Sequence, residues 1–241
     1  ENSTEESGVT VVAVKLGNYA QKGIIKISKT GEVFASVTAT DGVYQPVYAV
    51  QGLAGATYEI KATEDIYTPD GTLRCSAGEV VDTVTTGADG MAESKPLYLG
   101  KYEITEMKAP DGMVINKDAH TAELVYAGQE IEITETAASF CNDRQKARIS
   151  LSKVLEQNKQ FGIGMNNELS AVTFGFYAAE ELTAADDSVI PVDDLIEIMS
   201  LDENGKAVLR SDVPFGSYYV QEISTDSHYI LTDEKYPVIF S

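Results

Sequence analysis

The sequence predicts an all-β protein built of tandem antiparallel β-sandwich modules. Short runs rich in Val, Ile, Thr and Tyr alternate between apolar and polar residues, which is typical of strands that bury one face. Turn signals such as Pro69-Asp-Gly71 and Asn204-Gly205 separate these runs. Residues 189–200 are the one stretch that is compatible with a short helix, because no other stretch has a clear helical period.

The chain repeats itself, because three sequence blocks occur twice in the same order. Two blocks recur after 116 positions and the first block after 124, so the first copy carries a short insertion between Lys29 and Leu53. A repeat of this kind indicates two copies of one structural module. The matching blocks are residues 23–29 and 147–153, 53–64 and 169–180, and 100–106 and 216–222.

The composition excludes several classes of protein. The chain has 38 acidic and 18 basic side chains and a net charge of −20, so no basic surface is available for nucleic acid or for an anionic membrane. No apolar run approaches the roughly 20 residues that span a bilayer, and any secretion signal is expected to lie outside this sequence. The two cysteines are too few for a disulfide framework, although a bond between Cys75 and Cys141 remains open.

Charged residues occur at strand positions whose side chains should face the core. Lys29 has the parity of Ile25 and Ile27, and the acidic residue of each later block has the parity of its Tyr and Ile or Val neighbours. A buried charge without a partner is costly, so such groups are paired, neutralised or consumed chemically. The four residues in this position are Lys29 and Glu106 in the first copy, and Lys153 and Glu222 in the second.

An asparagine closes the pattern. Asn142 is in phase with Phe140 at the end of the first copy, and it precedes Lys153 by the same spacing by which Asn18 precedes Lys29. Asn18 is therefore expected to end a preceding module, with a cap or turn role as the alternative. Carrying Asn142 forward by the repeat offset leads to a position beyond the last residue, Ser241, so the second module is expected to lack its last strand.

These patterns divide the chain into three parts. Residues 1–20 are expected to be the last strand of a preceding module or an N-terminal extension. Residues 21–145 are expected to form the first module, and residues 146–241 the second. An exposed edge invites strand addition, so one hypothesis is that residues 9–18 of one molecule fill the open edge of another.

At these residues the chain resembles the Cna B-type, or SpaA-like, domains of Gram-positive surface adhesins and pilins. The most specific element runs from Gly100 to Gly112 with the pattern Gly-x-Tyr-x-Ile-x-Glu-x-x-Ala-Pro-Asp-Gly, whereas the second copy has Thr225-Asp226 where Ala-Pro stands. The resemblance covers nearly all of residues 21–241. It implies a prealbumin-like, Ig-like sandwich and a spontaneous isopeptide bond between a Lys and an Asn. The matching residues are Lys29 and Asn142 as the bonded pair, Glu106 as the promoting acid, Glu222 as its equivalent and Lys153 as the unpaired lysine.

The implied chemistry accounts for the inward charges. Burial favours the neutral amine of Lys29, which attacks the Asn142 carboxamide, while a protonated Glu106 polarises that amide and carries protons as ammonia leaves. The alternative is a buried Lys29–Glu106 salt bridge beside Asn142 without a covalent bond. The event occurs once per molecule, so no enzyme, no cofactor and no metal site are expected. The acidic turns, including residues 202–205, are interpreted as solvated surface, with calcium binding as the alternative.

The expected function is that of a structural stalk segment in a secreted cell-surface or cell-wall adhesin or pilin-like protein. Its partners would be neighbouring modules of a longer protein. A rival hypothesis is a module that binds host matrix protein or glycan through residues 32–50, which contain Phe34, Tyr44 and Tyr48. A weaker rival is an enzyme in which these sandwiches are accessory domains.

Overall fold

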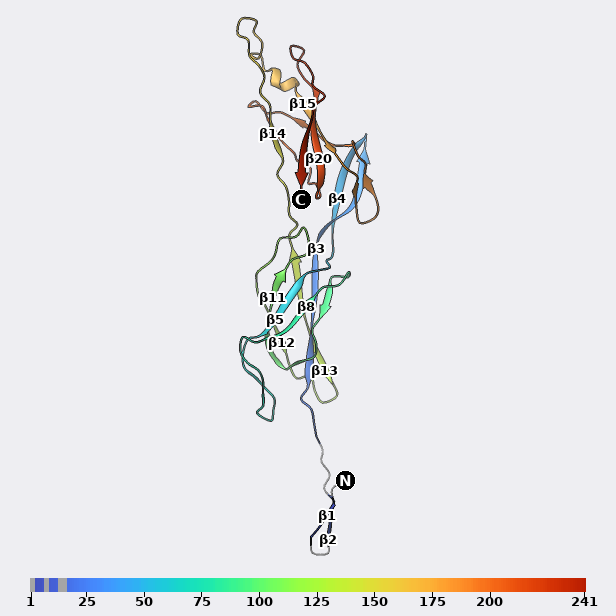
Figure 1. Ribbon diagram of the computed structural model, residues 1–241, viewed down its shortest axis with the longest axis vertical. Helices are drawn as coiled ribbons and strands as arrows, with labels where there is room; N and C mark the ends of the chain where they lie inside the picture. The colour runs from blue at the N-terminus through green and yellow to red at the C-terminus, as the bar shows by residue number, and fades with distance from the viewer. Residues whose placement is uncertain (1–2, 7–8, 13–16) are drawn as a thin grey trace.

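The computed structural model describes residues 3–6, 9–12 and 17–241 and confirms the all-β class. Two sandwich modules follow each other along the long axis of the molecule (Figure 1). Each module has its own buried apolar core, and the two cores share no residue. Within the described residues the helical structure is one 3₁₀ turn, η1 (Glu168–Ala171).

The first sheet of the first module is built around the long strand β3 (Lys22–Thr40). The strand buries every second residue from Gly23 to Gly31, as a strand with one face toward the core must. The last strand of the module runs parallel beside it and pairs Ile133 with Lys22 and Asn142 with Gly31. The strands paired with the first part of β3 are β13 (Ile133–Asn142), β9 (Met91–Glu93) and β10 (Leu97–Tyr98).

The second sheet of the first module closes the sandwich. Tyr58, Ile60, Tyr102 and Ile104 point from its two middle strands into the core and are fully buried. Burial of these side chains is the main favourable term for the module. The order of the sheet is β12 (His120–Leu124), β11 (Gly100–Lys108), β5 (Thr57–Ala62) and β8 (Val80–Thr85), and the small hairpin β6 (Ile66–Tyr67) and β7 (Leu73–Cys75) lies outside it.

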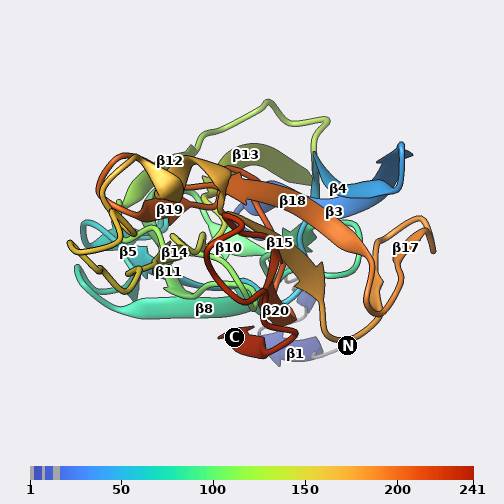
Figure 2. The ribbon, with the colours of Figure 1, turned by 90° about the horizontal axis from the view of Figure 1, so that it is seen from above.

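The insertion of the first module is a β-hairpin that reaches the second module. The strand β3 continues beyond its pairing with β13, turns at Asp41 and Gly42, and returns as β4 (Val43–Gly52). Both turn residues have positive φ, 52° and 78°, which is the geometry of a two-residue hairpin turn and suits Asp-Gly. β4 then pairs with the edge of the second module's sheet, Val43 with Leu195, and both views show the hairpin beside that sheet (Figures 1 and 2).

The second module repeats the architecture of the first, because strands β5 and β11 recur as strands with the same bounds after the repeat offset. Its main sheet has the order β18-β15-β20-β21, and a two-stranded sheet covers the other side. Within the described residues this small sheet contains no counterpart of β13. The strands are β15 (Thr173–Ala178), β18 (Leu195–Ser200), β20 (Gly216–Ser224), β21 (Lys235–Phe240), β14 (Ser150–Ser152) with β19 (Lys206–Val208), and β16 (Leu182–Thr183) with β17 (Val189–Ile190).

The short helix considered for residues 189–200 does not form. This stretch forms β17 and β18, separated by a turn. Pro191 lacks the N–H that a helix needs, and Asp193 has a left-handed φ of 65°. The apolar residues of the stretch instead extend the sheet, where Ile196 is fully buried.

The N-terminal residues were expected to include a strand from residue 9 to residue 18. In the structure, β1 (Ser3–Glu6) and β2 (Val9–Val12) pair with each other as a hairpin. Residues 13–16 of the expected strand lie outside the described residues, and Asn18 belongs to no strand. The role of residues 1–20 as part of a preceding module thus stays a prediction.

Candidate functional site

Three side chains predicted to lie in the buried phase meet in the core of the first module. Lys29 comes from β3, Glu106 from β11 and Asn142 from the end of β13. Their exposed fractions are 1%, 2% and 3%. Strand alternation places them there, because each has the same parity as the apolar core residues of its own strand. We call these three residues the Lys–Glu–Asn cluster.

The groups of the Lys–Glu–Asn cluster form a closed triangle. The Nζ atom of Lys29 lies 2.9 Å from Oε1 of Glu106 and donates a hydrogen bond to Oδ1 of Asn142. The Nδ2 atom of Asn142 donates to both carboxylate oxygens of Glu106, each at 3.0 Å. The lysine amine is therefore held beside the carboxamide, with one carboxyl group in contact with both nitrogen atoms.

Two further groups hold the Glu106 carboxyl in place. The backbone N–H of Asn116 donates to Oε2 at 2.8 Å, and the Tyr58 hydroxyl lies at the limit of a hydrogen bond to Oε1, 3.5 Å. Burial, and next the charge of Glu106, raise the pKa of Tyr58 far above its usual value, so this hydroxyl stays a donor. Sequence reasoning did not identify either residue. The parity of Tyr58 with Ile60 was a usable signal, whereas a backbone donor such as Asn116 leaves no signature.

Aromatic rings isolate the cluster from water. The rings of Tyr58 and Phe140 lie 4.6 Å apart between centroids, and the Nζ atom of Lys29 is 5.8 Å from the centre of the Tyr58 ring. Interactions between charged and polar groups are strong in such a dry environment. The arrangement can therefore position an amine for attack on an amide and move a proton between two nitrogens.

The second module holds the corresponding pair without a carboxamide. The Nζ atom of Lys153 lies 3.0 Å from Oε1 of Glu222, and Phe174 takes the place of Tyr58, 5.9 Å from that nitrogen. The Glu222 side chain is fully buried, but the Lys153 side chain is 27% exposed. No hydrogen-bond donor of good geometry reaches either oxygen of Glu222 from the described residues.

The insertion proposed as a ligand-contact surface is instead packed against the second module. Phe34, Val37 and Tyr44 lie against the second core, and Arg144 stacks on the ring of Tyr48 with 3.8 Å between its guanidinium carbon and the ring centre. The hairpin covers the otherwise open edge of β18, which protects an apolar strand from other partners. Phe34, Tyr44 and Tyr48 are thus half-buried at this junction, and ligand binding through residues 32–50 stays a hypothesis.

Polar contacts fix the remainder of the junction between the modules. Arg144 pairs with Asp212, and Lys146 lies 3.3 Å from the same carboxylate. The backbone N–H of Gln145 donates to the carbonyl of Gly112 at 2.8 Å. Gly112 lies so close to Phe215 that an added Cβ would stand 3.2 Å from its ring. The Ala-Pro-Asp-Gly turn of the first module therefore packs against the loop that precedes β20.

Other candidate sites contribute less. Cys75 is half-buried, Cys141 is exposed and both are free thiols, so the disulfide left open above is absent. No group of three or more His, Cys, Asp or Glu side chains gathers as a metal-ligand set in the part of the chain that the structure describes. Among the same residues, no helix has the length and apolar character needed to cross a membrane.

Comparisons with known proteins agree with this architecture. The curated Trypsin-resistant surface T6 protein of Streptococcus pyogenes serotype M6 is 32% identical over 74 residues, which are 30% of this chain and 14% of that protein. The solved structure of the Bacillus anthracis TIE protein shares the fold with a TM-score of 0.56 at 19% identity, over 92% of this chain and 31% of that chain. A family model described as the SpaA prealbumin-like fold domain matches residues 48–137 and 157–241. Since these matches cover more than half of the chain and fall in both modules, the chain belongs to the SpaA family of prealbumin-like fold domains.

Proposed function

We propose that this chain is a structural stalk segment of a secreted Gram-positive adhesin or pilin-like protein, located at the cell surface or in the cell wall. The observation that carries the proposal is the buried Lys–Glu–Asn cluster, which joins the first and last strands of one sandwich. The named relative from Streptococcus pyogenes is a surface protein, which is consistent with an extracellular location. The partners would be neighbouring modules of a longer protein.

The cluster forms an isopeptide bond without an enzyme. The Nζ atom of Lys29 attacks Cγ of Asn142, the new Nζ–Cγ amide forms, and the Cγ–Nδ2 bond breaks. Glu106 takes the proton that Nζ loses and delivers it to Nδ2, which leaves as ammonia. The contacts of 2.9 Å to Nζ and 3.0 Å to Nδ2 place one carboxyl within reach of both ends of this transfer. The step occurs once, because its product is part of the fold.

The bond would change how the module bears tension. It joins Lys29 directly to Asn142, so the whole chain between these two positions lies outside the path of the force. Tension on the N-terminal end of β3 would pass through the amide to the linker after Asn142. A hydrogen-bonded sheet would otherwise have to carry it, and its bonds are individually weak. This is the property that a stalk needs.

The second module has the matching lysine and acid, and among the described residues no carboxamide takes the place of Asn142 beside them. Lys153 and Glu222 are the equivalents of Lys29 and Glu106 and contact each other at 3.0 Å, and we propose that they remain an ion pair in this chain. The second module thus serves as an internal reference, because it shows how the buried lysine and glutamate are arranged when no asparagine accompanies them.

Intact mass of the purified chain tests the proposal. The wild-type chain should be lighter than its sequence by the mass of one ammonia. Lys29→Ala, Asn142→Ala and Glu106→Ala should each restore the full sequence mass, whereas Glu135→Gln, at an exposed carboxylate on β13, should leave the deficit unchanged. A full-mass wild-type chain would instead support the buried salt bridge and overturn the covalent proposal.

A further inference from the structure

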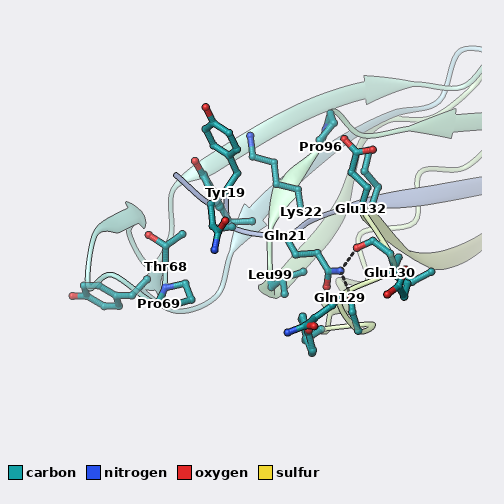
Figure 3. A pocket seen from close by; sticks show the side chains of 18 of the residues that line it. Tyr19, Gln21, Lys22, Thr68, Pro69, Pro96, Leu99, Gln129, Glu130 and Glu132 are labelled. Atoms are coloured by element: carbon teal, nitrogen blue, oxygen red, sulfur yellow. Dashed lines mark hydrogen bonds between the residues drawn. The ribbon is translucent and has the colours of Figure 1, made fainter. Parts of the chain in front are cut away.

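A large open hollow lies at the end of the first module that faces away from the second. Its volume is about 1300 Å³, and the segments around it are residues 17–22, 67–69, 96–99 and 126–133. Figure 3 shows Tyr19, Lys22 and Leu99 among the side chains that border it. Exposed aromatic groups gather there: Tyr19 is 99% exposed, Tyr126 61% and Tyr67 57%. A surface of this kind marks an interaction site.

The loop that lines this hollow has a counterpart in the second module. Tyr98 and Leu99 precede β11 as Pro214 and Phe215 precede β20, in both cases at an offset of 116. The hydroxyl of Tyr102 donates to the carbonyl of Tyr98, and the hydroxyl of Tyr218 donates to the carbonyl of Pro214 at 2.6 Å. The same tyrosine bond thus holds the loop in both modules.

In the second module this loop is in contact with the first module. Phe215 lies against Gly112, which belongs to the turn at the far end of the first module, and Asp212 holds Arg144 from the linker. The corresponding loop of the first module faces the hollow. The junction within this chain therefore shows which kind of surface fits such a loop.

The chain also enters both modules in the same way. Gln21-Lys22 and Gln145-Lys146 each begin at the third position after an asparagine, Asn18 or Asn142. The side chain of Gln21 bonds the backbone of the first module, donating to the carbonyl of Gly128 at 3.1 Å and accepting from the N–H of Ala127 at 3.0 Å. The entry segment is thus fastened beside the hollow.

Charge supports the same occupant. At the junction, Lys146 lies 3.8 Å from Glu32 of the preceding module. Its counterpart Lys22 stands over the ring of Tyr98, 4.8 Å from the centre, and Arg74 stands 5.1 Å from the same ring. No carboxylate of the described residues lies within ion-pair distance of Lys22. The hollow is bordered by Lys22 and also by Glu130 and Glu132. Lys22 is therefore the group that can pair with an acidic side chain of a docked module, as Lys146 does with Glu32.

We propose that the hollow is a docking face for the far end of another module of this type, the end that carries the Ala-Pro-Asp-Gly turn and the closing asparagine. The partner's turn would lie against Tyr98 and Leu99 as Gly112 lies against Phe215, and its last strand would end at the position of Asn18. This inference rests on the proposed stalk function and specifies its repeating contact. It also gives Tyr19, Tyr67 and Tyr126 a buried role.

A tandem protein tests this docking. A second copy of residues 21–142 is joined ahead of residue 19, so that its Asn142 replaces Asn18 and the rest of the chain is kept whole. The added copy should fold, because the first core draws all its buried residues from its own module. Hydrogen–deuterium exchange at residues 97–100 and 126–131 of the original module is then compared between the tandem protein and the 241-residue chain. Docking should slow this exchange by on the order of tenfold.

Matched variants separate docking from other effects. Lys22→Glu removes a cation of the hollow without touching the core and should return the exchange to the rate of the single chain. Met107→Ser, at a residue 55% exposed on β11, should not. Equal exchange in the tandem and single chains would overturn the docking. The ammonia deficit of the tandem protein reports the isopeptide bond separately, so a bonded but unprotected tandem contradicts the docking and a protected but unbonded tandem contradicts the cross-link.

Discussion

The two modules share one fold but differ in how their buried lysine and glutamate are completed. In the first module, β13 brings Asn142 to the pair and shields it, so that Lys29 is 1% exposed. In the second module no described strand takes the place of β13, and the Lys153 side chain is 27% exposed. The difference teaches that the last strand supplies both the carboxamide that contacts the pair and the wall that excludes water. Lysine and glutamate alone make an ion pair.

The modules also differ in what completes their sheets. The first sandwich is closed by its own strands, whereas the second receives the β3–β4 hairpin of its neighbour at the edge of β18. The apolar side chains of the hairpin extend the second core. The second module thus depends on the first for part of its packing, whereas the first core draws its buried residues from its own module.

The largest expected difference between the modules concerns their lysines. Lys29→Ala should remove the cross-link and the nitrogen that lies beside the buried Glu106 carboxyl, at a cost of about 3–5 kcal/mol in the free energy of unfolding. Lys153→Ala should cost less, about 1–3 kcal/mol, because no covalent bond is lost and solvent reaches the Lys153 side chain, although Glu222 stays buried. Denaturant unfolding of both variants and of wild type measures this. Equal losses would contradict the distinction drawn between the two sites.

A smaller effect should follow from loosening the hairpin. Phe34→Ser together with Tyr44→Ser should destabilise the second module by about 2–4 kcal/mol, because two half-buried aromatic contacts are lost, while the first core keeps its stability. Hydrogen exchange resolved by module measures this, with faster exchange expected in β18 and β15. Thr40→Ala, at an exposed residue near the hairpin turn, is the control. Unchanged exchange in β18 would show that the hairpin does not support the second module.

The smallest expected effect is a local loss of order in acid at the β6–β7 turn of the first module. The hydrogen bond from the Thr68 hydroxyl, followed by one from the backbone of Thr72, lowers the pKa of Asp70 from 3.8 to about 2. Because the pKa of Asp70 is lower in the folded state, ionised Asp70 stabilises the turn at pH values above its ordinary pKa of 3.8. This stabilisation is lost as the pH falls from 3.8 toward about 2. NMR of Thr72 across this range should show the change, and Asp70→Asn should abolish it. A turn that opens at the same pH in both proteins would contradict this assignment.

The sequence predicted the Lys–Glu–Asn cluster because alternation in a strand is strict. The parity of Lys29 with Ile27, and of Glu106 with Ile104, decides which face each side chain takes wherever it lies in the sheet. Alternation does not determine which strand pairs with which. The pattern in residues 32–50 therefore did not reveal that β4 pairs with β18. The helix considered for residues 189–200 failed for a related reason, since a short apolar stretch fits either structure until its neighbours are known. Backbone donors such as the N–H of Asn116 depend on loop geometry and leave no pattern.

The central claim is that the first module closes itself with an amide between Lys29 and Asn142 and that the second does not. Proteolytic digestion of the folded chain followed by mass spectrometry tests it directly, because an isopeptide bond leaves a branched peptide that joins the two strands. The account predicts one branched peptide, linking the Lys29 segment to the Asn142 segment, and a linear peptide containing an unmodified Lys153. Linear peptides at Lys29 and Asn142, with both side chains intact, would contradict it.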